Sequence, residues 1–340
     1  MTRFISKALV MLGAGTLLAA CGQPDTLFFV RNQDADMPVL VRGNLASGKM
    51  VLYVHGGPGS NGLTASTREG WQQIERSYAV AYWEQRGSGS SRGNATPDQF
   101  TMKQFSEDLD GVVDTLHRKY PNQRLILLGH SWGGALGSAY LLDAGHQAKI
   151  AGWIEVDGSH SVVEGNQRSW QTIKDVAPQH IASGPNADLW RKALAWHEQN
   201  PLSKEGFATH IGLVGQLEEE LAPPRPHDPM ANPRLGIATP YSPFTSAANQ
   251  GNMFEHFVKS DAFMSLDLTS QLGNIKIPSL VLWGRQDMRL PVEMATGAFN
   301  ALGTPAASKS MQVFEHSAHS PQDTEPEAFA AAVTSFVRSL

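Results

Sequence analysis

The chain has 340 residues and a formal net charge of −5, from 27 basic against 32 acidic side chains, and 41% of its residues are hydrophobic. This composition supplies one large core or two modest ones and excludes a disordered, highly charged tail protein. An acidic balance disfavours nucleic acid as a partner, because no surplus of cations is present to neutralise phosphates. The single cysteine, Cys21, excludes a disulfide framework or a thiolate metal centre.

The first twenty residues have the pattern of an export signal. Arg3 and Lys7 precede an apolar run over 8–20, which at 13 residues is too short to span a bilayer as a helix. No later stretch is long and apolar enough to span one. We therefore predict that residues 1–20 are a signal peptide.

The end of this run, Leu18-Ala-Ala-Cys21-Gly22, resembles the lipobox of bacterial lipoproteins, in which the signal is cut before a cysteine that receives lipid. An ordinary secretory signal with small residues at its cleavage site is the alternative. The resemblance implies a mature chain of net charge −7 that begins at Cys21 and is anchored by lipid on the exported side of a bacterial membrane. In a cell with two membranes, Gly22 implies the periplasmic face of the outer membrane.

Beyond the anchor, short β-rich runs alternate with helical patterns, which predicts a mostly parallel sheet covered by helices. The expected strands are 27–31, 39–42, 51–55, 79–84, 125–128, 152–156, 279–283 and 311–314. The first two are joined by the turn-forming Asn32-Gln33-Asp34. The expected helices are 105–120, 132–144, 292–302 and 326–340.

Strand patterns stop near residue 158 and resume near residue 279. The intervening segment has helical patterns at 166–175, 187–199 and 254–264 and a proline-rich stretch at 223–226. We expect a core in two parts, 21–158 and 269–340, with the insertion 159–268 folded over it as a helical cap.

A nucleophile motif follows the expected strand 125–128. Gly129-His-Ser131-Trp-Gly133 lies between this strand and a helix, the context in which Gly-x-Ser-x-Gly forms a strained turn that presents the serine. We predict that Ser131 is a nucleophile.

A glycine-rich turn, His55-Gly-Gly57-Pro-Gly59, follows an earlier strand. Without side chains in the way, its backbone N–H groups can reach a developing oxyanion. We assign the oxyanion hole to the N–H groups of Gly57 and Trp132.

These residues resemble the α/β-hydrolase fold, and within it the proline iminopeptidase (prolyl aminopeptidase) branch. The resemblance rests on the motifs at 55–59 and 129–134 and on Glu84-Gln-Arg-Gly-Ser-Gly-Ser-Ser91, which is similar to a segment of that branch with Asp at its first position. It implies a sheet flanked by helices, an inserted helical cap and hydrolase activity without a cofactor.

An acyl-transfer serine needs a histidine base and a carboxylate to orient it, in the chain order Ser, acid, His in this fold. The family pattern assigns these roles to Asp287 and His319, each just past a strand. Asp157 and His316 are the rival candidates. We expect His55 and His130, beside the motifs, to make structural hydrogen bonds.

No metal site is predicted, because the 12 histidines are scattered and no His-Glu-x-x-His motif is present. No Gly-x-Gly-x-x-Gly follows the first strand to suggest a dinucleotide.

The substrate is expected to be a small molecule or short peptide. In proline iminopeptidases, acidic cap residues bind the substrate's amino group, and Glu198 is similar to one of them, whereas near residues 248–254 no second acid appears before Glu255. Glu218-Glu-Glu220 has the default interpretation of a solvated charge run. Three functions stay open: an aminopeptidase, which the resemblance favours; an esterase, amidase or lactonase for neutral acyl compounds; and an inactive, lipid-tethered binding protein.

Overall fold

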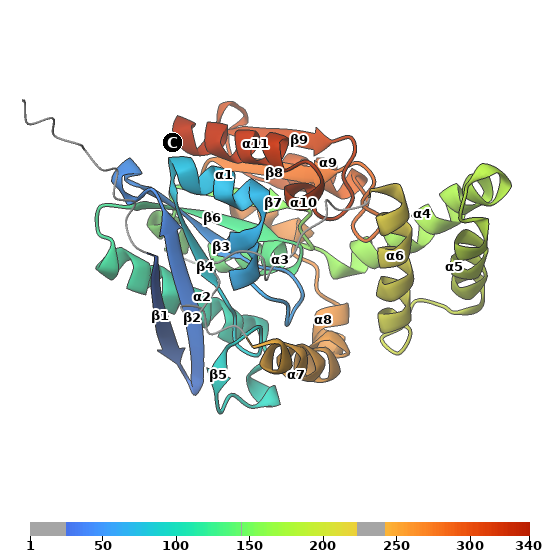
Figure 1. Cartoon of the computed structure of the whole chain (residues 1–340), viewed down its shortest axis with the longest axis horizontal. Helices are drawn as coiled ribbons and strands as arrows, with labels where there is room; N and C mark the ends of the chain where they lie inside the picture. Colours follow the sequence, from blue (N-terminus) through green and yellow to red (C-terminus); the bar gives the residue numbers. More distant parts are fainter. Residues whose placement is uncertain (1–24, 144, 223–241) are drawn as a thin grey trace, which may run out of the picture.

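The computed structural model describes residues 25–143, 145–222 and 242–340 (Figure 1). The expected signal peptide, the lipidation site Cys21 and the proline-rich stretch 223–226 lie outside the described residues. Within the described ranges, no helix is long and apolar enough to cross a membrane.

A mostly parallel sheet forms the centre of the molecule, as predicted. Its strand order is β1-β2-β4-β3-β6-β7-β8-β9, and the short β5 pairs with β2. Strand β2 runs antiparallel to β1, β4 and β5. The six strands β4, β3, β6, β7, β8 and β9 are parallel to one another. The bounds are β1 Thr26–Asn32, β2 Ala35–Gly43, β3 Lys49–Val54, β4 Ala79–Trp83, β5 Arg92–Gly93, β6 Arg124–His130, β7 Gly152–Val156, β8 Ser279–Gly284 and β9 Lys309–Phe314.

Alternate strand residues build two hydrophobic cores, one on each face of the sheet. Leu52 and Val54 of β3 face one core with α2 (Met102–Lys119), α3 (Trp132–Leu142) and α9 (Glu293–Ala301). Val51 and Tyr53 face the other, with α1 (Glu69–Ser77) and α11 (Pro326–Ser339). Helices therefore cover both faces of the sheet (Figure 1). The loops that follow the ends of the strands are not covered in this way and can carry functional side chains.

Several predicted local features are confirmed. Strand β7 has the predicted bounds, and Gln33 and Asp34 both have positive φ in the hairpin turn between β1 and β2. The single helix expected over 254–264 is wrong: a π-helical turn, Phe254–Val258, and the short α8, Asp261–Met264, occupy this segment. Helix α1 and the short α10, Pro321–Thr324, were not predicted.

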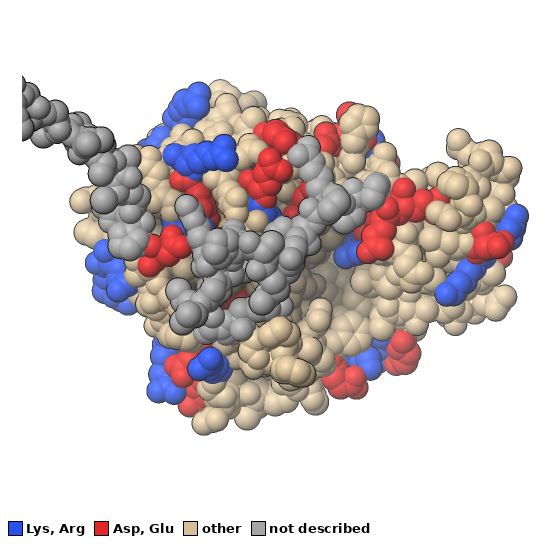
Figure 2. Space-filling model, viewed as in Figure 1, with Lys and Arg blue, Asp and Glu red and all other residues tan. Residues whose placement is uncertain are grey.

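The segment between β7 and β8 is helical where it is described. Helices α4 (Val162–Ser183), α5 (Ala187–Gln199) and α6 (Phe207–Leu221) extend to one side of the sheet, and α7 (Pro243–Met253) lies below it in Figure 1. Acidic and basic side chains are interspersed on the face shown in Figure 2, and the described residues there form no extended basic stripe.

Candidate active site

The carboxyl ends of the central parallel strands meet at one edge of the sheet, where open α/β sheets place their chemistry. The turn 55–59 follows β3, and Ser131 follows β6. Asp287 lies in the loop 285–291 after β8, here called the acid loop, and His319 follows β9. Strand order in space therefore brings together residues that are far apart in the sequence.

Ser131 occupies the strained turn that its motif predicts. Its φ of 56° and ψ of −121° are rare for a residue with a side chain. A Cβ at Gly133 would lie 1.9 Å from the carbonyl oxygen of Val54, and a Cβ at Gly129 would lie 2.2 Å from that of Gly133. Both motif glycines are needed because strand, turn and helix approach so closely.

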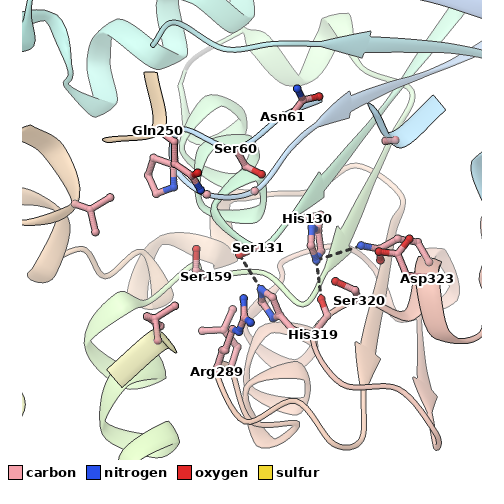
Figure 3. A pocket seen from close by; sticks show the side chains of 18 of the residues that line it. Ser60, Asn61, His130, Ser131, Ser159, Gln250, Arg289, His319, Ser320 and Asp323 are labelled. Carbon is pink, nitrogen blue, oxygen red and sulfur yellow. Dashed lines mark hydrogen bonds between the residues drawn. The ribbon is translucent and has the colours of Figure 1, made fainter. Parts of the chain in front are cut away.

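A continuous hydrogen-bond chain joins Ser131, His319 and Asp287. His319 Nε2 lies 2.9 Å from Ser131 Oγ (Figure 3), and its Nδ1 lies 2.8 Å from Asp287 Oδ2. Neither rival candidate contacts His319 in this chain: His316 is exposed, and Asp157 lies behind Asp287, where its Oδ1 accepts the backbone N–H of Gly284 and its carboxyl interacts with that of Asp287. The arrangement has the geometry in which a histidine can take a proton from a serine hydroxyl.

The electrostatics of the site favour a neutral histidine. Burial, and after it the positive charge of Arg289, lower the pKa of His319 to about 3. Burial raises the pKa of Asp287 to about 6. The hydrogen bond from the backbone N–H of Leu290 opposes this rise, because it stabilises the charged carboxylate. A neutral imidazole at neutral pH is the form that can act as a general base.

The acid loop is held by a residue whose role the sequence interpretation missed. Glu218 is buried, not solvated as its charge run suggested, and its Oε1 accepts the backbone N–H groups of Met288 and Arg289 at 3.0 and 3.1 Å. Helical spacing could have placed it correctly, because Val214, Leu217 and Glu218 share one buried face of α6. The inserted helices thus contribute directly to the support of Asp287.

The glycine turn lies directly against the nucleophile. A Cβ at Gly56 would be 3.0 Å from Ser131 Cβ, and Gly57, with φ +119°, lines the same cavity as Ser131. Trp132 is the first residue of α3, so its backbone N–H belongs to the helix terminus that lacks an internal acceptor. Gly57 and Trp132, predicted to form the oxyanion hole, therefore both lie beside Ser131.

Histidines beside the motifs make structural hydrogen bonds, as expected. His55 Nδ1 contacts the Gly56 carbonyl at 2.7 Å, and His55 Nε2 accepts the N–H of Gln85 at 3.2 Å. His130 Nε2 donates to the carbonyl of His319 at 2.7 Å. Gln85 Oε1 also accepts a hydrogen bond from the indole N–H of Trp132. The segment 84–91 therefore links the turn 55–59 to the residue that follows Ser131.

A cavity of about 520 Å³ opens beside Ser131 and His319. Among its lining residues are Gly57, Asn61, Gln250, Arg289 and Asp323 (Figure 3). Glu198, expected to bind a substrate amino group, instead lies exposed on α5 and does not line this cavity. In the described ranges, no cluster of side chains has the composition of a metal site.

Comparison with known proteins assigns the family. A model of the alpha/beta hydrolase fold matches residues 49–326, and the chain belongs to this family of hydrolases. It is 24% identical to "Probable aminopeptidase YbaC" of Bacillus subtilis (strain 168), over 88% of this chain and 92% of that protein. It is 26% identical to "Proline iminopeptidase" of Heyndrickxia coagulans, over 86% and 92%.

A solved structure confirms the fold. The crystal structure of proline iminopeptidase from Mycobacterium smegmatis superposes with a TM-score of 0.62 and 18% identity, covering 92% of this chain and 98% of that one. The α/β-hydrolase fold and the sequence similarity to aminopeptidase-like relatives were both expected from the motifs, and both are confirmed.

Proposed function

We propose that the chain hydrolyses small ester or amide bonds through an acyl-enzyme on Ser131. The observation that carries this proposal is the hydrogen-bond chain from Ser131 Oγ through His319 to Asp287. The cavity beside this chain supports it, because 520 Å³ is a volume suited to a small-molecule substrate.

The proposed reaction has two steps. Ser131 Oγ attacks the substrate carbonyl while His319 Nε2 takes its proton, and the N–H groups of Gly57 and Trp132 stabilise the oxyanion. His319 then protonates the leaving group as the bond to it breaks. Water, activated by His319, attacks the acyl-enzyme and releases the acid and free Ser131. Asp287 keeps His319 in the required tautomer and stabilises its protonated form.

The test of the substrate class is a paired assay. We expect the protein from residue 22, which lacks the signal peptide and Cys21, to hydrolyse a short-chain aryl ester, and Ser131→Ala to abolish this turnover. A fluorophosphonate probe provides an independent readout, since it labels an activated serine without requiring the correct substrate. Failure of both labelling and turnover would contradict the proposal.

Release of an N-terminal residue is the second candidate function, favoured by the names of the two relatives. An aminopeptidase of this kind needs a carboxylate for the substrate's ammonium group. Asp323 is a candidate, because it lines the cavity; its Oδ1 lies 3.7 Å from Arg68 Nη1.

If this candidate is correct, a prolyl arylamide is cleaved, and N-acetylation of the proline lowers kcat/KM by about tenfold or more, because a charge-assisted contact is lost. Asp323→Asn should lower cleavage of the free-amino substrate in the same way. Equal turnover of both arylamides would contradict the aminopeptidase function, and hydrolysis of neutral esters or amides would remain as the proposed function.

We further propose that the protein is a lipoprotein anchored at Cys21. The lipobox-like sequence supports this, and β1 begins only a few residues later, at Thr26. When the full chain is expressed in a bacterium with two membranes, we expect incorporation of a fatty-acid analogue and partition into detergent, both lost in Cys21→Ser. A wild-type chain that is exported but unlabelled would support the ordinary secretory signal instead.

A further inference from the structure

Arg289 presents a positive charge to the cavity beside the reacting groups. It follows Asp287 by two residues in the acid loop and lies alongside His319 on the same wall (Figure 3). Its side chain is 34% exposed, which lets a bound molecule reach it. Its positive charge contributes to the low pKa of His319, which places it within electrostatic range of the catalytic pair.

The inner end of this side chain is held in place. Arg289 Nε lies 2.8 Å from Glu218 Oε2, and Glu218 is itself fixed by the backbone N–H groups of Met288 and Arg289. Among the described residues, no hydrogen-bond acceptor engages the two terminal nitrogens of Arg289. The ion pair with Glu218 therefore fixes the inner end of the guanidinium, and the terminal nitrogens, one of which lies against Gly215 of α6, keep donors for a ligand.

Glu218 does not fully cancel the charge of Arg289. Burial raises the pKa of Glu218 to about 7, with the nearby Asp287 carboxylate adding to the shift. Near neutral pH, Glu218 is thus protonated in part of the molecules, whereas the guanidinium stays charged. Glu218 therefore compensates the charge of Arg289 only in part.

The surroundings of Arg289 define the kind of anion that fits. The cavity combines apolar lining residues, Val162, Phe207, Ile211, Val258, Phe263 and Leu290, with uncharged polar ones such as Ser159, Asn166 and Gln250. The carboxylate among the described lining residues, Asp323, already faces Arg68. Of the two arginines in the described part of the cavity lining, Arg68 is paired with Asp323, which leaves Arg289 for a ligand. This single guanidinium among apolar and uncharged side chains suits an apolar chain ending in a singly charged carboxylate better than a doubly charged phosphate, because desolvation of the latter costs more.

We propose that Arg289 selects substrates that carry a carboxylate a few bonds from the scissile carbonyl. This proposal rests on the proposed hydrolysis at Ser131 and names its substrate class. The carboxylate can belong to the acyl part, as in the half-ester of a dicarboxylic acid, or to the leaving group, as in a hydroxybenzoate ester or a peptide.

Two matched ester pairs separate these sources. For the acyl side, the mono-4-nitrophenyl ester of adipic acid is compared with 4-nitrophenyl hexanoate. For the leaving group, the hexanoyl ester of 4-hydroxybenzoate is compared with that of 4-methylphenol. The measured quantity is the ratio of kcat/KM for the charged ester to that for its neutral partner, so a general effect of a substitution on folding or on the triad cancels.

We expect Arg289→Gln to lower this ratio about ten- to a hundredfold in one of the two pairs, mainly through KM, because a charge-assisted bidentate contact is lost. Arg289→Lys should restore part of the ratio, since it keeps the charge. Glu218→Gln should preserve or raise it, because Arg289 then retains its full charge.

A ratio that changes less than threefold in both pairs would overturn the proposal. So would an equal fall in Glu218→Gln, which would assign the effect to disturbance of the acid loop. Neutral esters cleaved by the wild type but not by Ser131→Ala would show that the proposed hydrolysis survives even if Arg289 fails this test. No turnover of any ester and no fluorophosphonate labelling would mean that the hydrolysis itself is wrong.

Discussion

Replacing Ser131 by alanine is expected to lower kcat/KM for an ester substrate by roughly 10⁴- to 10⁶-fold, the range known for serine nucleophiles of hydrolases. The reason is geometric. His319 Nε2 lies 2.9 Å from Ser131 Oγ, and the deletion removes the one atom that forms the acyl bond. Stability should change little, because alanine meets the same unfavourable φ of 56° as serine. Steady-state kinetics and a denaturant titration of the same preparations check both expectations.

His316, three positions before His319, is the control for the assignment of the catalytic base. His319→Ala should cause a loss comparable to that of Ser131→Ala, whereas His316→Ala should stay within about twofold of the wild type, because His316 is exposed and forms no part of the hydrogen-bond chain. If His316→Ala proved as damaging as His319→Ala, the assignment of the base would be wrong.

Replacing Asp108 by alanine is expected to lower the free energy of unfolding by about 3–5 kcal/mol, because it leaves a buried cation without its partner. Arg86, from the segment 84–91, and Asp108, from α2, have fully buried side chains joined by two hydrogen bonds of 2.5 and 2.8 Å. The same carboxylate accepts from Asn32 and Gln104, so these amides lose a partner as well. Urea unfolding of the two proteins measures the difference.

A neighbouring ion pair on the same helix is the control. Lys103 and Glu107 are 3.8 Å apart, and the Lys103 side chain is 87% exposed. Glu107→Ala should therefore change the free energy of unfolding by no more than about 0.5 kcal/mol. The double variant Arg86→Met, Asp108→Leu should recover much of the loss, since no buried charge remains. A cost below about 1 kcal/mol for Asp108→Ala would contradict the structural role given to Arg86.

The fold and the reacting residues could be predicted because their signals are local. Strand β7 has the predicted bounds, and the motif around Ser131 is recognised within five consecutive residues, 129–133, placed between a strand and a helix. Asp287 and His319 each follow a strand directly, so correct strands place them at the same edge of the sheet.

The substrate side of the site could not be predicted in this way, because it depends on how the inserted helices sit against the sheet. Glu198 had the sequence context of an ammonium ligand, but the packing of α5 leaves it exposed. Glu218 looked solvated beside Glu219 and Glu220, but α6 turns it toward the acid loop. Arg289 belongs to none of the motifs, and only the folded chain brings its side chain to the cavity.

The contact of Glu218 with the acid loop links two parts of the chain that are often regarded as exchangeable modules. A chimera that took its inserted helices from a relative without an acid at this position would leave the N–H groups of Met288 and Arg289 without their acceptor. Such a graft is expected to loosen the support of Asp287 and to release Arg289 in a single step. An exchange of the inserted helices would therefore have to keep an acid at position 218 to keep the acid loop in place.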